Sequence, residues 1–339
     1  MIPWGWLGGA RPYDQRMAAA DLLTLDDVQA ARGRIGDRLH RTPTFTSATL
    51  SRRIGATAHL KAELFQRTGS FKPRGVLNIL GRLSPEERAR GVIGVSAGNH
   101  AQALAYCAAL EGLDCLVVMW QGASEAKLAA TREYGAEVDQ EAAGPTDSFE
   151  RLNELMERTG RALVHPFDDP RGHAWAGTVG LELLEDVPEA DVVVVPVGGG
   201  GLISGIAAAV KGARPEARVV GVEPDGSRAL FEALRAGEPV PVTPVSVADG
   251  LNAPFAGTNC LAVCRELVDE VVLVTEEEIN QGMRFLYERG KLACEPAGAA
   301  ATGALLAGKV PVESGENVVA IVSGGNVTPE NASAILGEK

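Results

Sequence analysis

The sequence is short of cysteine, aromatic residues and lysine, and its formal net charge is −12. Its five cysteines are odd in number and form no CxxC pair. A disulfide framework and a cysteine-based zinc site are therefore both unfavoured, and buried free thiols in a reducing compartment are expected. The acidic balance argues against a nucleic-acid surface or a polybasic membrane patch.

Long apolar runs are also missing. The best is the four-valine run at 192–195, whereas a membrane-spanning helix needs about 20 apolar residues. The first nine residues lack the basic segment and long apolar stretch of a signal peptide. We expect a soluble, cytoplasmic protein. Met17 is a more natural start, so residues 1–16 are predicted to be a flexible N-terminal extension.

The 339 residues are 45% hydrophobic and 22% charged, enough for a substantial core and two lobes. Turn-rich stretches at 83–87 and 166–170 are the predicted hinges. We therefore predict a large domain from residues 17–89 and 168–339, with a small domain inserted at 90–167. Thr24, three residues before Asp27, is predicted to cap a first helix in a capping-box arrangement.

One unit recurs along the chain. Short apolar strands at 91–95, 115–119, 191–197 and 318–322 are each followed by a predicted helix, often across a glycine turn. Alternating strands and helices predict an α/β fold of open, mostly parallel sheets with helices on both faces. Ligands in such sheets bind at the carboxyl ends of the strands, which is where the glycine turns fall.

The stretch at 64–75 contains Lys72, one of seven lysines. It follows a Gly-Ser turn and an aromatic residue and precedes Pro73, so it is expected on a fixed backbone and partly desolvated. Desolvation lowers an ammonium pKa and frees the amine as a nucleophile. A lone lysine is usually a solvated charge, however, and the local setting alone leaves that alternative open.

Four consecutive glycines stand at 198–201, between a predicted strand and a predicted helix. Glycines permit backbone N–H groups to converge on a phosphate, and the helix N-terminus adds partial positive charge. A dinucleotide-binding loop is the alternative, because Glu223 ends the next strand near where a ribose-binding acid would stand. The glycine run does not satisfy G-x-G-x-x-G, and that reading gives Lys72 and Asn99 no role.

Together with Lys72, three further motifs occur in a characteristic order: SAGNHAQ at 96–102, GGGGL at 198–202 and SGGN at 323–326. In order and spacing they resemble the fold-type II pyridoxal-phosphate (PLP) enzymes, whose fold is like that of the tryptophan synthase β subunit. The threonine/serine dehydratase and serine racemase branch is the most similar. The resemblance spans residues 25–335.

The resemblance implies a role for each motif. Lys72 binds PLP covalently and later removes the substrate Cα proton. The cofactor-binding set is Phe71, Lys72, Asn99, Gly198, Gly199, Gly200, Gly201, Leu202, Glu295 and Ser323, with Asn99 on the ring 3′-oxygen, Glu295 at the ring edge and Ser323 facing the pyridine nitrogen. A serine cannot enforce a protonated ring nitrogen, which favours β-elimination. The substrate-binding loop is Ser96, Ala97, Gly98, Asn99 and His100, with His100 favoured as a packed supporting residue.

The sequence also departs from this branch. Racemases carry a second serine where Ala97 stands. Relatives that bind a divalent cation use an acid near Glu223 and another six residues on, where Ala229 stands, so a metal site at Glu223 is doubtful. A Gly-Gln pair is replaced by Trp175-Ala176, which either reshapes the pocket or packs in the large lobe. We expect no isoleucine feedback, because little chain follows the SGGN motif.

The prediction is a PLP-dependent ammonia-lyase that converts L-threonine, L-serine or both to 2-oxobutanoate or pyruvate plus ammonia, as a homodimer. Alternatives that keep the cofactor are serine racemase and dehydratases of 3-hydroxyaspartate or an aryl-serine. A non-catalytic binding protein and, more remotely, a nicotinamide dehydrogenase come from other classes.

Overall fold

The computed structural model describes residues 23–144, 147–169 and 173–337, so the extension predicted for residues 1–16 lies outside the described residues. The α-helices are α1 (Leu25–Ile35), α2 (Ala48–Ile54), α3 (Lys72–Leu80), α4 (Pro85–Arg90), α5 (Asn99–Leu110), α6 (Glu125–Glu133), α7 (Asp147–Thr159), α8 (Gly177–Asp186), α9 (Gly201–Ala213), α10 (Ala229–Ala236), α11 (Thr258–Leu267), α12 (Glu276–Phe285), α13 (Pro296–Leu306) and α14 (Pro329–Gly337). The strands are β1 (Thr44–Thr46), β2 (Thr57–Ala62), β3 (Val92–Val95), β4 (Cys115–Trp120), β5 (Glu137–Ala142), β6 (Ala162–Leu163), β7 (Val192–Pro196), β8 (Arg218–Pro224), β9 (Glu270–Val274) and β10 (Asn317–Val322). Shorter helical turns are η3 (Gly36–Arg38), η4 (Glu63–Phe65), η5 (Arg67–Gly69), η6 (His173–Trp175), η7 (Asp249–Leu251) and η8 (Leu286–Gly290).

These strands form a six-stranded sheet of order β1-β2-β10-β7-β8-β9 and a four-stranded sheet of order β5-β4-β3-β6. Every pairing is parallel except that of β1 with β2. The predicted α/β fold of mostly parallel sheets is confirmed. Parallel strands need long crossovers, and helices provide them.

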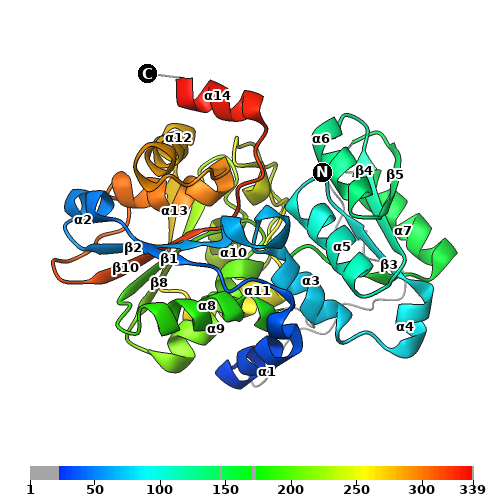
Figure 1. Ribbon diagram of the computed structural model, residues 1–339, viewed down its shortest axis with the longest axis horizontal. Helices are drawn as coiled ribbons and strands as arrows, with labels where there is room; N and C mark the ends of the chain where they lie inside the picture. Colours follow the sequence, from blue (N-terminus) through cyan, green and yellow to red (C-terminus); the bar gives the residue numbers. More distant parts are fainter. Residues whose placement is uncertain (1–22, 145–146, 170–172, 338–339) are drawn as a thin grey trace.

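Helices cover both faces of the large sheet. Val192 and Val194 of β7 point into a core shared with α12 and α13, whereas Val193 and Val195 point into a second core shared with α8 and α9. Side chains alternate along a strand, so a run of four valines is suited to burial on both sides. In Figure 1, α12 and α13 lie on one side of this sheet and α8 and α9 on the other.

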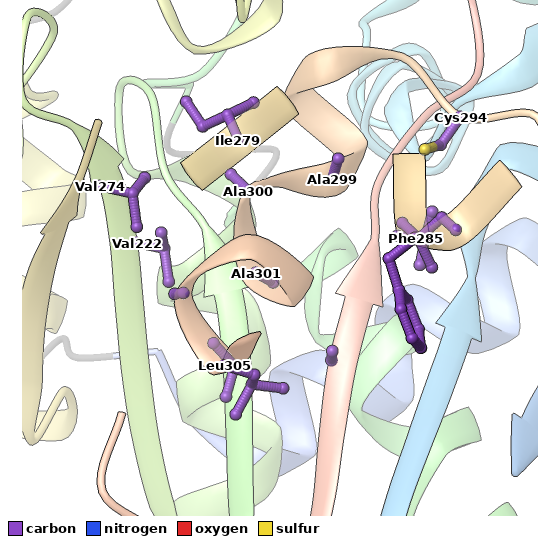
Figure 2. Packing of buried hydrophobic residues seen from close by; sticks show 14 of the residues in the cluster. Val222, Val274, Ile279, Phe285, Cys294, Ala299, Ala300, Ala301 and Leu305 are labelled. Carbon is purple, nitrogen blue, oxygen red and sulfur yellow. The ribbon is translucent and has the colours of Figure 1, made fainter. Parts of the chain in front are cut away.

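Helix α13 runs against the centre of the large sheet. Its side chains are mostly alanine and glycine, so it approaches its neighbours closely. A Cβ at Gly303 would lie 2.4 Å from the carbonyl oxygen of Glu278 on α12. Figure 2 shows Ala300 near Ile279 of α12, and Leu305 further along α13 in the same apolar layer. Small residues on α13 let this helix pack closely against both α12 and the large sheet.

The second sheet is built from residues 92–163, inside the range predicted for the inserted domain. Its core extends beyond that range, because Val76, Leu77 and Leu80 of α3 pack in the same cluster as Val117 and Met119 of β4. Helix α3 therefore joins the two parts of the molecule (Figure 1). The predicted domain boundaries themselves stay a prediction.

Local signals agree with the structure at several points. The Thr24 hydroxyl accepts a hydrogen bond from the Asp27 N–H, and the Asp27 carboxylate accepts one from the Thr24 N–H, so the predicted capping box is confirmed. All five cysteines are free and buried, as predicted. In the described part of the chain, no helix has the length and apolar character needed to cross a membrane.

Candidate active site

The turn before Lys72 is held against the end of β10. Phe71 donates its N–H to the Ser323 carbonyl at 3.1 Å, and Gly325 donates its N–H to the Gly69 carbonyl at 2.9 Å. Gly69 has φ +73°, and a Cβ there would lie 2.4 Å from the Asn326 side-chain oxygen. Glycine is therefore required both by the backbone and by the close neighbour. The turn fixes the start of α3.

Lys72 is the first residue of α3 and is half-buried. Its amine donates to the Pro166 carbonyl at 2.9 Å and lies 5.0 Å from the centroid of the Phe71 ring. Burial lowers the pKa of Lys72 to about 8, while Cys260 and Glu295 act in the opposite direction. A helix N-terminus also disfavours a cation. The side chain is placed as a nucleophilic amine requires.

The four glycines lie where β7 ends and α9 begins. Gly200 caps α9 with φ +97°. A Cβ at Gly199 would lie 2.3 Å from the Phe167 ring, and one at Gly200 would lie 2.7 Å from the Cys260 Cβ. The register of β10 with β7 brings this loop beside the Ser323 end of β10. A bare backbone at a helix N-terminus is an anion-binding arrangement.

Leu202, in contrast, is 6% exposed and packs in the core beneath α9. Gly198 lies against the backbone of Leu251. Ser323 is 3% exposed at the end of β10.

Asn99 connects the two sheets across the site. Its amide nitrogen donates to a Glu295 carboxyl oxygen at 2.7 Å, and its oxygen accepts from the Asn326 amide at 2.8 Å. Burial, and then the charge of Asp249, raise the pKa of Glu295 to about 8. Glu295 is therefore largely neutral at pH 7. Asn326 belongs to the SGGN motif, yet sequence reasoning gave it no role.

The loop before α5 contains the predicted substrate-binding residues. Ser96, Ala97 and Gly98 are half-buried, and the Gly98 N–H donates to the Ser96 hydroxyl at 3.1 Å. His100 is 4% exposed, and its Nε2 lies 2.9 Å from the Val164 carbonyl. That contact requires Nε2–H as donor. Burial and then Lys72 lower the pKa of His100 to about 3, so the imidazole is neutral.

A small pocket adjoins the amine of Lys72. His100, His165, Phe167 and Trp175 are among the residues that line it. Lys72 and His100 come from predicted motifs, whereas Phe167 comes from the predicted hinge at 166–170 and His165 immediately precedes it. The pocket therefore brings together α3, the start of α5 and the segment that follows β6.

The segment 165–168 is the main part of the site that the sequence did not reveal. The Asp168 carboxylate accepts the N–H groups of Thr258, Asn259 and Cys260 at the start of α11, at 2.9 to 3.3 Å. This cap fixes Phe167 against the glycine loop. Asp168 before a turn carried no periodic signal, because its partners lie about 90 residues further along the chain.

Glu223 is fully buried near the end of β8. Its two oxygens accept the N–H groups of Leu230 and Phe231, at 2.9 and 2.7 Å, at the start of α10. Burial raises the pKa of Glu223 to about 8, against the effect of those two bonds. Within residues 23–144, 147–169 and 173–337, no group of three His, Cys, Asp or Glu side chains gathers as a metal site.

Comparisons with known proteins bear on this geometry. A family model described as "Pyridoxal-phosphate dependent enzyme" matches residues 35–324. The catabolic L-threonine dehydratase of Escherichia coli (strain K12) is 40% identical over 317 residues, which cover 93% of this chain and 96% of that protein. The L-threonine ammonia-lyase of Thermotoga maritima is 42% identical over 308 residues, which cover 90% of this chain and 76% of that protein.

Two solved structures are similar over most of their length. Maize serine racemase has a TM-score of 0.87 at 36% identity, covering 91% of this chain and 94% of that one. The processed form of threonine deaminase isoform 2 from Solanum lycopersicum has a TM-score of 0.87 at 33% identity, covering 92% of this chain and 91% of that one.

Proposed function

The chain belongs to the family of pyridoxal-phosphate-dependent enzymes, and from that premise we propose that it is a lyase that dehydrates and deaminates L-threonine, L-serine or both. The products are 2-oxobutanoate or pyruvate, plus ammonia. The observation that carries the proposal is the position of the Lys72 amine. Burial lowers its pKa to about 8, and it lies at the end of the sheet where the four glycines also lie. The similar dehydratases support the choice of reaction.

The residues present fit the cofactor. Gly199 and Gly200 leave the backbone bare at the positive end of α9, where Phe167 and Cys260 pack too closely to allow a Cβ. The Ser70 hydroxyl, next to Gly324 in the lysine turn, is buried with no hydrogen-bond partner, so it is available to a bound group. Lys72 would hold the cofactor covalently, and the glycine loop would hold its phosphate.

Asn99, Glu295, Ser323 and Phe71 would surround the ring, with Leu202 supporting the loop from the core. When bound, the cofactor supplies an electron sink that loosens the proton on the substrate Cα. The neutral hydroxyl of Ser323 cannot hold a permanent positive charge on the ring nitrogen. The ring is then a weaker sink, which favours prompt loss of the β-hydroxyl over a long-lived carbanion.

Lys72 is suited to the proton transfer. With a pKa of about 8, about one-tenth of the amine is unprotonated at pH 7, against less than about one-thousandth for an ordinary lysine. The loop of Ser96, Ala97, Gly98, Asn99 and His100 is proposed to bind the substrate carboxylate through backbone N–H groups. The neutral His100 holds the segment that leads to Pro166.

The test is release of 2-oxo acid from a panel that contains threonine, serine, 3-hydroxyaspartate and an aryl-serine. Lys72→Ala should abolish release, whereas Lys309→Ala, at an exposed lysine that pairs with Glu278, should keep it. Absence of turnover in a protein that binds the cofactor would instead support a non-catalytic binding protein. Hydride transfer without the cofactor would support the dehydrogenase alternative.

Serine racemase is the second candidate, because the maize enzyme is structurally similar. Ala97 argues against it, since a methyl group cannot donate a proton to the opposite face of the substrate. Chiral analysis of serine recovered after incubation separates the two. The dehydratase proposal expects no D-serine from the wild type, and accumulation of D-serine with Ala97 in place would overturn it.

Two coarser properties belong to the same proposal. The family likeness suggests a homodimer, which light scattering of the purified protein can test. The five free thiols suit a reducing compartment such as the cytoplasm, and fractionation of cells can test this location. We propose no divalent cation, because the oxygens of Glu223 are already used by backbone N–H groups.

A further inference from the structure

We propose that Trp175 is a positioning residue, which fixes Lys72 through the ring of Phe71 and keeps water out of the pocket around the amine. This inference rests on the proposed function and adds a residue to it. Trp175 stands where the resemblance leads one to expect the first residue of a Gly-Gln pair.

The first observation is a stack. The Trp175 indole and the Phe71 ring are parallel to within 8°, with centroids 5.5 Å apart. The amine of Lys72, the next residue, lies 5.0 Å from the centroid of the same Phe71 ring. The indole therefore limits the movement of the ring against which the amine rests.

The second observation is that Trp175 is itself held tightly. It is 5% exposed, and a Cβ at Gly75 on α3 would lie 2.5 Å from the indole. Its carbonyl accepts the Thr178 hydroxyl at 2.7 Å. The indole thus fills the space beside the first turn of α3, where a smaller side chain would leave a cavity.

The third observation is that Trp175 and Lys72 line one pocket. The indole of Trp175 is the largest side chain that lines this pocket. Without it, water would reach the amine and restore part of the hydration that the ammonium form loses. Burial is the largest cause of the low pKa of Lys72, so hydration should raise that pKa towards the ordinary value.

The experiment measures the pH dependence of cofactor attachment. Apoprotein is mixed with pyridoxal phosphate, and the growth of visible absorbance is followed across pH. The unprotonated amine is the nucleophile, so below its pKa the rate should fall about tenfold per pH unit. For the wild type, the midpoint should lie near the pKa of about 8.

Four variants are compared. Trp175→Phe keeps a ring on Phe71 and should keep the midpoint. Trp175→Leu fills part of the space without a ring, and Trp175→Ala opens it. Both should move the midpoint up by about one unit, which slows attachment at pH 7 about tenfold. Trp120→Phe, on β4, is the matched control and should behave like the wild type.

A second readout uses energy transfer from tryptophan to the bound cofactor. Excitation of the indoles should give cofactor emission in the wild type and in Trp120→Phe, and much less in Trp175→Phe. Because this variant keeps a ring on Phe71, it gives a result even where Trp175→Ala does not fold. Transfer of unchanged strength in Trp175→Phe would contradict the shared pocket.

The outcomes distinguish failure of the proposed function from failure of the role proposed for Trp175. A wild type that attaches no cofactor at Lys72 defeats the proposed function. A wild type that attaches it, with Trp175→Leu at an unchanged midpoint, defeats this inference alone. A purely structural role would lower the melting temperature of the Leu variant while leaving its midpoint in place, and that result also counts against the proposal.

Discussion

Replacing Arg74 with methionine should destabilise the fold strongly. Arg74 is on α3, two residues after Lys72, and is 2% exposed. Its guanidinium donates to Glu63 at 2.8 and 2.9 Å and to Glu182 at 2.7 and 2.9 Å. The same carboxylate of Glu182 accepts from Lys61 at 2.9 Å. Two buried cations and two buried carboxylates thus form one balanced network.

The magnitude follows from what methionine would leave behind. Glu63 is fully buried and Glu182 is 8% exposed. Without Arg74, Glu63 would keep the Thr42 hydroxyl. Glu182 would keep Lys61, which also pairs with Asp186. Breaking a buried pair by removing one partner costs about 3–5 kcal/mol. That is a large part of the roughly 5–15 kcal/mol that holds a typical protein folded. Methionine keeps much of the volume, so the loss is mainly electrostatic.

The loss should also depend on pH. Burial alone would raise the pKa of Glu182, but the hydrogen bonds and charges of Arg74 and Lys61 bring it below its ordinary value. A lowered carboxyl pKa stabilises the fold above the unfolded pKa, and the gain is lost as the pH falls through the folded pKa. The variant lacks most of this gain, so the gap between the two proteins should widen as the pH rises from about pH 3 to pH 5 and stay constant above that.

The assay is urea unfolding of both proteins across that pH range. Arg32→Met is the matched control, because Arg32 pairs with Glu185 at the surface, where the side chains are 49% and 42% exposed. Such a pair contributes at most about 1 kcal/mol. An Arg74→Met loss as small as the control's, or one that does not vary with pH, would refute the reasoning.

Three further predictions concern the site. Lys72→Ala should remove the visible absorbance of the bound cofactor and lower turnover by at least about 10²-fold, since it loses a general base; borohydride labelling at another lysine would contradict this. Gly199→Ala should weaken cofactor retention, measured by dialysis, because the new Cβ would lie 2.3 Å from the Phe167 ring. Gly33→Ala is the control and should retain the cofactor, because a Cβ there has no neighbour within 4 Å. Burial raises the pKa of Glu295 to about 8, so its contribution to wild-type stability is lost as the pH rises towards 8. In urea unfolding between about pH 5 and pH 8, Glu295→Gln should not show that loss of stability. If the stability of the variant fell with pH in parallel with that of the wild type, the raised pKa of Glu295 would be ruled out.

The regular part of the fold was predictable from local pattern. Buried parallel strands such as β7 and β10 are continuous apolar runs, and each precedes a glycine turn and a helix, so period and composition agree. β5 was not predicted, because its sequence EVDQEA is half-solvated at the edge of the small sheet and carries charges instead of an apolar run. β1 has only three residues, too few to show a strand pattern in the sequence.

The site was predictable where a residue's own neighbours in sequence shape it. Lys72 with its Gly-Ser turn, the glycines before α9 and Asn99 at the start of α5 are of this kind. Phe167, Asp168 and Asn326 acquire their contacts from segments about 30 to 260 residues away. No local pattern records such a partner.

The sequence alone determined which stretches become buried strands, where the backbone must lack side chains, and which amine stands at the start of a helix, because each depends on neighbouring residues. Tertiary structure decided how charged that amine is, through the burial supplied by Pro166, Phe167 and the stacked ring of Trp175. It also decided that Glu295 is neutral and that Glu223 caps a helix. A pKa depends on hydration and nearby charge, and the fold sets both by bringing distant segments together.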